Sequence, residues 1–310
     1  MTRRLPVTIG LALLLGGVLL AAPLDWHRAE KVSQGVRLLT IDRKLPQGNG
    51  KTILLKGKLL RVDLRTPGLR FIGTGRDRDW GKPMPDHQPK SGQPNTIRTR
   101  RISTPAFMKE CMRPKSEGGR GLDMVAAFNT CPWLPWEAPF NHKYAEPLGV
   151  NISQGVVISD NDRVSAHFVI WRDGTVELRD VIPKDDYKRV WLSIGGFGLT
   201  LKNGQPTPAC ADKSRAPRTA LALSANANYL YVLTIDGRQP GWSDGATYDE
   251  LNVILTEAGA SDVINLDGGG STTLCIRDPK TGKPTVVSHA TSQGAYCRPV
   301  AMNLGIYFAK

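Results

Sequence analysis

The feature that most constrains this chain is a short apolar stretch that ends in an acid and a run of glycines. Residues 263–266 form a short, mostly apolar run that predicts a buried strand. One acid, three glycines and three hydroxyl residues follow it: Asp267, Gly268, Gly269, Gly270, Ser271, Thr272 and Thr273. Adjacent glycines cost conformational entropy when they become ordered, so they indicate a sharp turn or a close approach to another group. The stretch predicts a binding or catalytic loop, with a tight glycine turn between two strands as the alternative.

A strand and a helix precede this loop. Residues 229–235 are apolar, aromatic and β-branched, and they predict a strand that ends at Asp236. Residues 247–258 predict a helix, because Thr247 and Glu250 have capping-box spacing. Together with the strand before the glycines, these segments predict a βαβ unit.

This unit has a chemical consequence, because a strand–helix–strand unit of this length is expected to have parallel strands. Asp236 and Asp267 then leave the sheet at the same edge, which is where open α/β sheets bind ligands. Two carboxylates beside a glycine loop predict an acid/base or nucleophile pair. In the alternative, one carboxylate accepts hydrogen bonds from the loop amides and only holds the loop in shape.

Short strand patterns run through much of the remaining chain. Strands are expected at residues 51–65, 69–73, 124–128, 149–157, 166–171, 175–178, 218–223, 273–276 and 301–308. Ser103 predicts the start of a short helix, with Pro105 in its first turn. The expected fold class is α/β or α+β, with a mixed β-sheet core, a βαβ unit near the C-terminus and flanking helices.

Two further side chains stand where a predicted strand meets a loop. Asn129 ends one strand, and three aromatic residues follow it closely: Trp133, Trp136 and Phe140. These aromatic residues are expected to pack locally, and stacking on a sugar ring is the alternative. Arg218 opens another strand, where it either pairs with an acid or holds a phosphate in a bidentate contact.

The N-terminus has the pattern of an export signal. Arg3 and Arg4 precede an apolar stretch from Val7 to Leu20, and small residues follow. Residues 1–22 are therefore expected to be a signal peptide, with an uncleaved membrane anchor as the alternative. The apolar run is short for a membrane span. The sequence predicts an exported protein, periplasmic or secreted.

Export makes the five cysteines informative, because disulfides form in oxidising compartments. Cys111 with Cys131, and Cys275 with Cys297, close the shortest loops and are expected to form disulfides. Cys210 is then the unpaired thiol. Buried free thiols are the alternative.

The formal net charge of +13 favours acidic partners such as nucleic acid, anionic lipid or phosphorylated sugars. The sequence has none of the common nucleic-acid-binding modules, and no nucleic acid partner is expected. A P-loop is excluded because β structure follows the glycines, and three adjacent glycines lack the spacing of a dinucleotide fingerprint. The five histidines show no metal-ligand spacing.

The glycine motif and its context resemble the phosphodiester glycosidase family. The segments that carry the resemblance are Asn265–Thr273, Glu257–Ala260, Asp236–Arg238, Asp244–Thr247, Arg218–Thr219 and, more weakly, Ala126–Asn129 and Pro147–Gly149. It covers roughly residues 60–308. This chain departs from many relatives after Asn129, where Thr130 and Cys131 stand in place of two glycines.

The resemblance implies an exported hydrolase that cleaves a sugar-1-phosphodiester or a related envelope glycan linkage. It implies a domain over residues 51–310, preceded by an N-terminal lead-in at 23–50. Asp267 or Asp236 is expected to act as nucleophile or base, and Asn129 to position hydroxyl groups. Substrate contacts are expected from Arg218, Thr219, Gly268, Gly269, Gly270, Ser271 and Thr272.

No cofactor is expected, with a requirement for a divalent cation as the alternative. The expected partner is a sugar phosphodiester or an anionic glycan, with membrane contact only through an uncleaved signal anchor. Two other functions also stay open. One is a non-catalytic module that binds anionic glycans, and the other is a metal-dependent phosphoesterase with Asp236 and Asp267 as oxygen ligands.

Overall fold

A computed structural model describes residues 23–46, 50–87, 95–137, 140–289 and 297–309. The signal peptide predicted at residues 1–22 lies outside the described residues. Within the described ranges, no helix combines the length and apolar character needed to cross a membrane.

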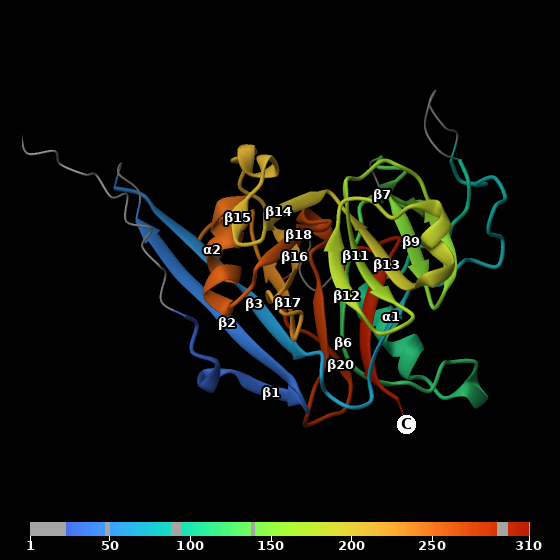
Figure 1. Ribbon diagram of the computed structural model, residues 1–310, viewed down its shortest axis with the longest axis horizontal. Helices are drawn as coiled ribbons and strands as arrows, with labels where there is room; N and C mark the ends of the chain where they lie inside the picture. Colours follow the sequence, from blue (N-terminus) through green and yellow to red (C-terminus); the bar gives the residue numbers. More distant parts are fainter. Residues whose placement is uncertain (1–22, 47–49, 88–94, 138–139, 290–296, 310) are drawn as a thin grey trace, which may run out of the picture.

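The described part of the chain is predominantly β structure, arranged in antiparallel sheets (Figure 1). The first sheet has eight strands. In spatial order they are β1 (Glu30–Ser33), β2 (Val36–Pro46), β3 (Thr52–Asp63), β17 (Tyr229–Ile235), β16 (Arg218–Leu223), β18 (Asp262–Asn265), β14 (Gly198–Lys202) and β15 (Gln205–Pro206). Residues 23–50, predicted to be a lead-in, thus contribute β1 and β2 to the same sheet as the candidate site strands.

Two five-stranded sheets and one small sheet complete the β structure. The second sheet consists of β10 (Val156–Asp160), β9 (Val150–Ser153), β13 (Val190–Gly196), β11 (Ala166–Trp171) and β12 (Val176–Arg179). The third consists of β20 (Pro284–Val286), β19 (Leu274–Arg277), β6 (Asp123–Asn129), β21 (Asn303–Phe308) and β4 (Leu69–Gly73). The small sheet consists of β5 (Thr99–Arg100), β8 (Tyr144–Pro147) and β7 (Trp133–Leu134).

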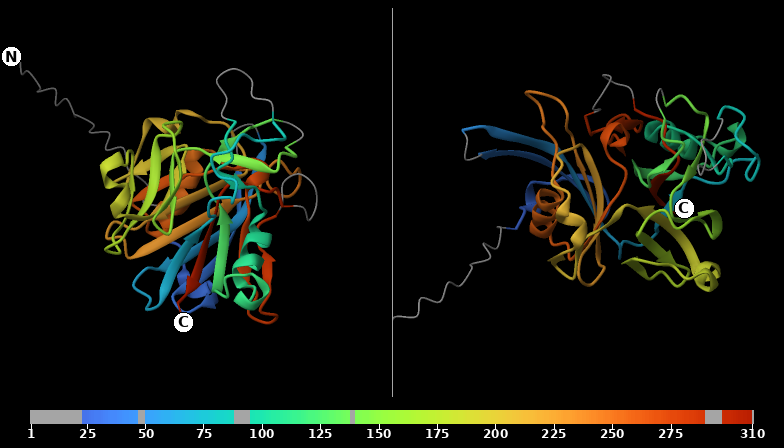
Figure 2. Two further views of the ribbon diagram at one scale, coloured as in Figure 1. Left: turned by 90° about the vertical axis from the view of Figure 1, so that its right-hand side faces the viewer. Right: turned by 90° about the horizontal axis from the view of Figure 1, so that it is seen from above.

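One apolar core joins the three large sheets. Buried side chains of all three sheets meet in this core, among them Leu60, Phe128, Phe168, Leu221 and Ile264. Seen from above, α2 (Tyr248–Ala258) lies on the opposite side of the eight-stranded sheet from the other two large sheets (Figure 2). A shorter helix, α1 (Thr104–Met112), packs against the sheet of β6. The eight-stranded sheet is therefore covered on both faces.

Helix α2 forms as the sequence predicts. Thr247 Oγ1 accepts from the Glu250 amide, and the Glu250 carboxylate accepts from the Thr247 amide, which completes the capping box. The helix ends at Gly259, whose φ of 104° is a conformation that favours glycine. Leu251, Ile254 and Leu255 form the face of the helix that is buried against the sheet.

The prediction of a mixed sheet is wrong for the described residues, because every strand pair there is antiparallel. Strands β17 and β18 do run in the same direction, but β16 lies between them and pairs with both. The reason is local. A short connection folds β16 and β17 into a hairpin, so β18 reaches the sheet only on the free side of β16. The fold is α+β with a split βαβ unit.

Candidate functional site

The split βαβ unit brings Asp236 and Asp267 to one edge of the eight-stranded sheet, as the sequence predicts. Asp236 follows β17 directly, and Asp267 lies two residues beyond β18. One strand separates the two, which corresponds to roughly 10 Å between their backbones. Both side chains are buried, with 3% and 7% exposure. The edge therefore holds two carboxyl groups that are largely removed from water.

The glycine loop is shaped by close contact with the residue before β16. A Cβ atom at Gly268 would lie 2.5 Å from the Pro217 carbonyl oxygen, so no larger residue fits there. The Gly269 amide donates to the same carbonyl at 2.9 Å. This hydrogen bond occupies one of the amides predicted to bind a phosphate. Gly269 has a φ of 57° and opens the short 3-10 turn Gly269–Ser271.

Asp267 is the acid of the described site whose pKa is raised most. Its amide donates to the Thr130 carbonyl at 2.8 Å, which fixes its backbone. Its Oδ2 atom is buried and has no hydrogen-bond partner in the described structure. Burial raises the pKa of Asp267 to about 6, and nearby Ser271, Arg298 and the Gly268 amide act in the opposite direction. A carboxyl group with such a pKa exchanges protons near neutral pH.

Two of the three hydroxyl residues after the glycines, Ser271 and Thr272, also have oxygen atoms available for hydrogen bonds. Ser271 Oγ and Thr272 Oγ1 are buried atoms that make no hydrogen bond of normal geometry to the described residues. Because buried polar atoms are nearly always satisfied, a group of three such atoms beside Asp267 indicates a site for a polar ligand or for water. Ser271 and Thr272 thus lie where the sequence predicts substrate contacts.

Asn129, in contrast, makes three side-chain hydrogen bonds within the protein. Its side-chain amide donates to the Asp267 carbonyl at 2.6 Å. Its side-chain oxygen accepts from the Thr219 hydroxyl and from the Thr273 amide, both at 2.9 Å. This one side chain joins β6, β16 and both ends of the glycine loop. Asn129 and Thr219 are therefore joined to the loop by hydrogen bonds within the protein, and the predicted contact of either with a substrate stays a prediction.

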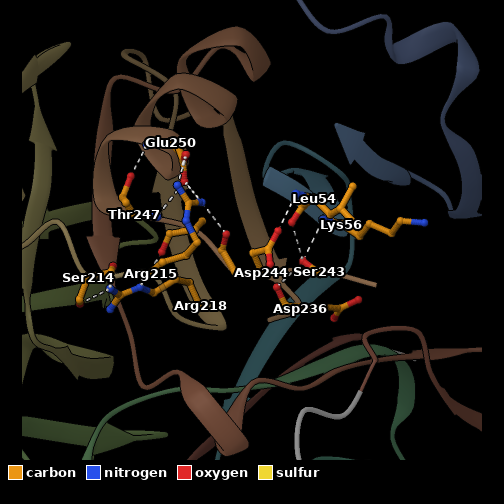
Figure 3. A network of polar contacts seen from close by, with 12 residues as sticks. Leu54, Lys56, Ser214, Arg215, Arg218, Asp236, Ser243, Asp244, Thr247 and Glu250 are labelled. Atoms are coloured by element: carbon orange, nitrogen blue, oxygen red, sulfur yellow. Dashed lines mark hydrogen bonds and ion pairs between the residues drawn. The ribbon is translucent and has the colours of Figure 1, made fainter. Parts of the chain in front are cut away.

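Arg218 lies on the other face of the sheet from Thr219. Its guanidinium donates to the Ser214 carbonyl (Figure 3). It also donates to the Ala246 carbonyl and to the Tyr248 hydroxyl. It also stacks 4.2 Å from the Tyr248 ring centre. Since neighbouring residues of a strand point to opposite faces, Arg218 joins α2 while Thr219 points toward Asn129. The structure therefore does not bring the Arg218 guanidinium together with Asp267.

Asp236 occupies a pocket of its own. Its two carboxylate oxygens accept from the Trp242 indole at 3.0 Å and from the His289 amide at 2.8 Å. Burial raises the pKa of Asp236, against the effect of these two hydrogen bonds. A pocket of about 340 Å³ opens beside it, lined by Lys56 and Lys58 among others. Asp236 is thus a well-anchored acid in a basic, partly aromatic pocket.

Two arginines that the sequence reasoning did not single out lie over the glycine loop. A Cβ atom at Gly269 would lie 3.3 Å from Arg238 Nη1, and one at Gly270 would lie 2.5 Å from Arg298 Nη2. Arg238 follows Asp236 by two residues, and this closeness to a candidate acid could have identified it from the sequence. Nothing near Arg298 in the sequence marks it. These arginines take the place beside the loop that was predicted for Arg218.

An aromatic group borders the same region. The Arg298 guanidinium lies 5.2 Å from the Trp136 ring and 4.8 Å from the Phe140 ring. Trp133 is buried and its indole lies close to Asp267, whereas Trp136 is 46% exposed. Trp133 therefore packs locally, as expected, and Trp136, although half exposed, packs against the Trp133 and Phe140 rings.

The predicted disulfides are not formed, because all five cysteines are free and buried. Cys111 packs on α1 with Phe107 and Met108, whereas Cys131 belongs to the central core beside Asp267. These two positions lie in separate apolar clusters. Burial, together with the Asp267 charge, raises the pKa of the Cys131 thiol. Cys275 and Cys297 lie near each other as separate thiols.

Comparison with known proteins identifies the family. The sequence model of the phosphodiester glycosidases matches residues 137–307, which is more than half of the chain. The chain belongs to the phosphodiester glycosidase family. It is therefore a hydrolase, of a family that acts on phosphodiester-linked sugars. No functionally curated protein matches the sequence significantly.

Solved structures share the fold. The catalytic domain of zebrafish N-acetylglucosamine-1-phosphodiester α-N-acetylglucosaminidase, auto-inhibited by its pro-peptide, aligns with a TM-score of 0.58 and 16% identity. The alignment covers 91% of this chain and 85% of that one. A hypothetical protein from Synechocystis aligns with a TM-score of 0.54 and 12% identity, over 91% of this chain and 63% of that one. At these identities the likeness establishes the fold alone.

Proposed function

We propose that this chain is an exported hydrolase that cleaves a sugar-1-phosphodiester or a related envelope glycan linkage. The observation that carries the proposal is the Asp267 carboxyl group. It is buried, it has a pKa of about 6, and it has an oxygen without a partner beside Arg298 and the glycine loop. The zebrafish enzyme, whose name describes such a reaction on N-acetylglucosamine, supports the same substrate class.

The reaction that fits these residues breaks the bond between the sugar C1 and the phosphate oxygen. Water supplies a hydroxyl group to C1 and a proton to the departing phosphate monoester. Ionised Asp267 either attacks C1 or removes the proton from water. Arg298 and Arg238 offset the phosphate charge, and a sugar ring stacks on the exposed face of Trp136. Because phosphate monoesters leave readily, stabilising charge matters more here than protonating the leaving group.

Asp236 is the second carboxyl group at this edge. Both of its oxygens already accept hydrogen bonds, so its ionised form is held in one orientation. In our proposal it contributes negative charge near the oxocarbenium-like carbon while Asp267 carries the proton transfer or attack. The basic pocket beside it supplies a route for an anionic group toward the sheet edge.

Export rests on the N-terminal pattern and on one structural neighbour. Residues 1–22 have the charged and apolar regions of a signal peptide. A Burkholderia pseudomallei protein described as a candidate exported protein aligns with a TM-score of 0.50 and 13% identity, over 83% of this chain and 74% of that one.

Hydrolysis of a panel of sugar-1-phosphodiesters, measured as release of the reducing sugar, tests the proposal. We expect turnover by the wild type and a loss of about 10²–10⁴-fold for Asp267→Asn. Arg298→Gln is expected to lower kcat/KM at least about tenfold. Arg100→Gln, at an exposed position away from the glycine loop, is the matched control and should retain full activity.

The pH profile adds a second test. Since the proposal requires ionised Asp267, kcat/KM should rise through an apparent pKa of about 6 and then level off.

Equal activity of the wild type and Asp267→Asn would overturn the assignment. Binding of an anionic glycan without any turnover would favour the non-catalytic alternative. The metal-dependent phosphoesterase has less support, because both Asp236 oxygens are engaged.

A further inference from the structure

We propose that His87, Glu137 and His142 form a binding site for a divalent transition-metal ion, Zn²⁺ in particular. One ligand atom from each residue lies within 4.8 Å of the others. Glu137 and His142 lie in the connection between β7 and β8, His87 comes from a distant part of the chain, and none of the three lies on the glycine loop. The site is therefore distinct from the aspartates of the proposed reaction.

The two imidazole rings are placed as metal-binding histidines are. The His87 side chain is 2% exposed, and the ring centres of His87 and His142 lie 5.2 Å apart. Nε2 of each ring is buried and has no hydrogen-bond partner in the described structure. A buried ring nitrogen normally has a hydrogen-bond partner. Two buried nitrogens without one, in a single cluster, indicate a site where a metal ion can bind both.

A second contact selects the tautomer of the neutral His142 ring. Its Nδ1 atom lies 3.1 Å from the Asp86 carbonyl oxygen. Because a carbonyl oxygen only accepts, Nδ1 carries the hydrogen, and in the neutral ring Nε2 keeps its lone pair. Metal-binding histidines typically use one nitrogen for the ion and donate the other N–H to a carbonyl or carboxylate. His142 has this arrangement.

The ligand set indicates which ion fits. Two imidazole nitrogens and one carboxylate oxygen match Zn²⁺, which takes four tetrahedral ligands and readily leaves the fourth to water. Alkaline-earth ions prefer sets made of oxygen atoms. One ligand atom of each residue already lies within 4.8 Å of the other two, so small side-chain movements bring the ligands to zinc distances of about 2.0–2.2 Å.

The site connects to the aromatic group beside Asp267. Glu137 directly follows Trp136, and the Phe140 amide donates to the Glu137 carbonyl at 2.8 Å. An ion at Glu137 therefore fastens the turn that carries both aromatic rings. We infer that zinc holds this aromatic segment in place next to Arg298, which itself contacts both rings.

The test measures metal on the purified full-length protein. Zinc content by elemental mass spectrometry is expected to be about one ion per chain, and Co²⁺ substitution should give the visible absorption of a tetrahedral site. His87→Ala and His142→Ala should each weaken zinc binding at least tenfold. His27→Ala, at an exposed histidine outside the cluster, is the matched control and should bind zinc like the wild type.

After zinc has been removed with a chelator, its addition should raise the Tm of the wild type and of His27→Ala but not of His87→Ala or His142→Ala. Circular dichroism without metal should be the same for all four proteins, which separates lost binding from lost folding. Absence of a zinc-dependent Tm rise in the wild type would overturn the proposal. So would equal zinc affinity in the wild type and both cluster variants.

Discussion

At the scale of single residues, burial favours the protonated form of Asp267, whereas the proposed reaction needs the ionised form. Burial beside Cys131 and Trp133 raises its pKa to about 6 from an ordinary 3.8. The proposed reaction needs the ionised form, which burial disfavours. The fold thus holds a carboxylate that would be more stable in water, a common property of residues with perturbed pKa values at functional sites.

This conflict predicts that Asp267→Asn stabilises the protein at neutral and alkaline pH. The folded-state pKa is raised, so the folded state binds the proton more tightly than the unfolded chain does. The stability contributed by the protonated acid is complete below about pH 4 and is lost as the pH rises through about 6. Above that pH the ionised wild type is destabilised by about 3 kcal/mol, and the variant avoids that cost.

Urea unfolding of both proteins between pH 4 and 8 measures this difference. The gain of Asp267→Asn should grow with pH and reach a plateau above about pH 7. Asp162→Asn, at an exposed position, serves as the control and should change the free energy of unfolding by less than about 0.5 kcal/mol. A gain for Asp267→Asn that is the same at every pH would contradict a raised pKa.

The acids and the glycine loop were predicted from the sequence, whereas the arginines that lie beside the loop, Arg238 and Arg298, were not. Asp267 and the glycines lie together in the chain, so their proximity needs no tertiary information. Whether Arg218 faces the loop depends on which face of β16 it occupies. The partners of β16 decide that, and its sequence does not reveal them. Arg298 reaches Gly270 from a distant segment, which no local pattern reports.

At the scale of elements, helix α2 sets the position of β18 and hence of Asp267. Its capping box satisfies amide groups that otherwise have no partner inside the helix. The helix ends at Gly259, where the chain turns toward β18.

Thr247→Ala should therefore destabilise the protein by about 1 kcal/mol, since the Glu250 amide loses its acceptor. Chemical denaturation monitored by circular dichroism measures the change. Thr256→Ala lies in the same helix at an exposed position and removes no cap, so it should be neutral or slightly stabilising. Equal effects of the two substitutions would show that the capping box contributes nothing.

Local signals account for which elements were predictable. Strands β4, β11, β16 and β17 and helix α2 agree closely with their sequence patterns, because alternation, caps and turn residues act over short distances. The order of strands in the sheet was not predictable, since β3 and β16 pair with β17 across very different sequence separations. Strands β1 and β2 were missed because residues 25–50 carry mixed signals.

At the scale of the whole molecule, the cysteines show that the apolar core stabilises this fold without cross-links. All five thiols are buried in the structure, and burial raises the pKa of Cys275 to about 12 and that of Cys111 to about 11. Such thiols are poor nucleophiles while the protein is folded.

We expect iodoacetamide to modify none of the five thiols readily in the native protein, and all five after denaturation without reductant. Intact-mass measurement counts the adducts. A parallel sample reduced before denaturation is the control and should give the same count. Two fewer adducts in the unreduced sample would reveal one disulfide and contradict the structure.

The crowding at Gly268 has a consequence for how this enzyme can diversify. Any side chain at that position meets the Pro217 carbonyl, so the loop tolerates almost no variation without moving Asp267. Trp136 and Arg238 stand on exposed segments that face the same region and are free of this restriction. Evolution can therefore alter the substrate range through these outer segments while the catalytic loop stays constant. Under the proposed function, we therefore expect selectivity to depend on these outer segments and chemical competence to depend on the loop.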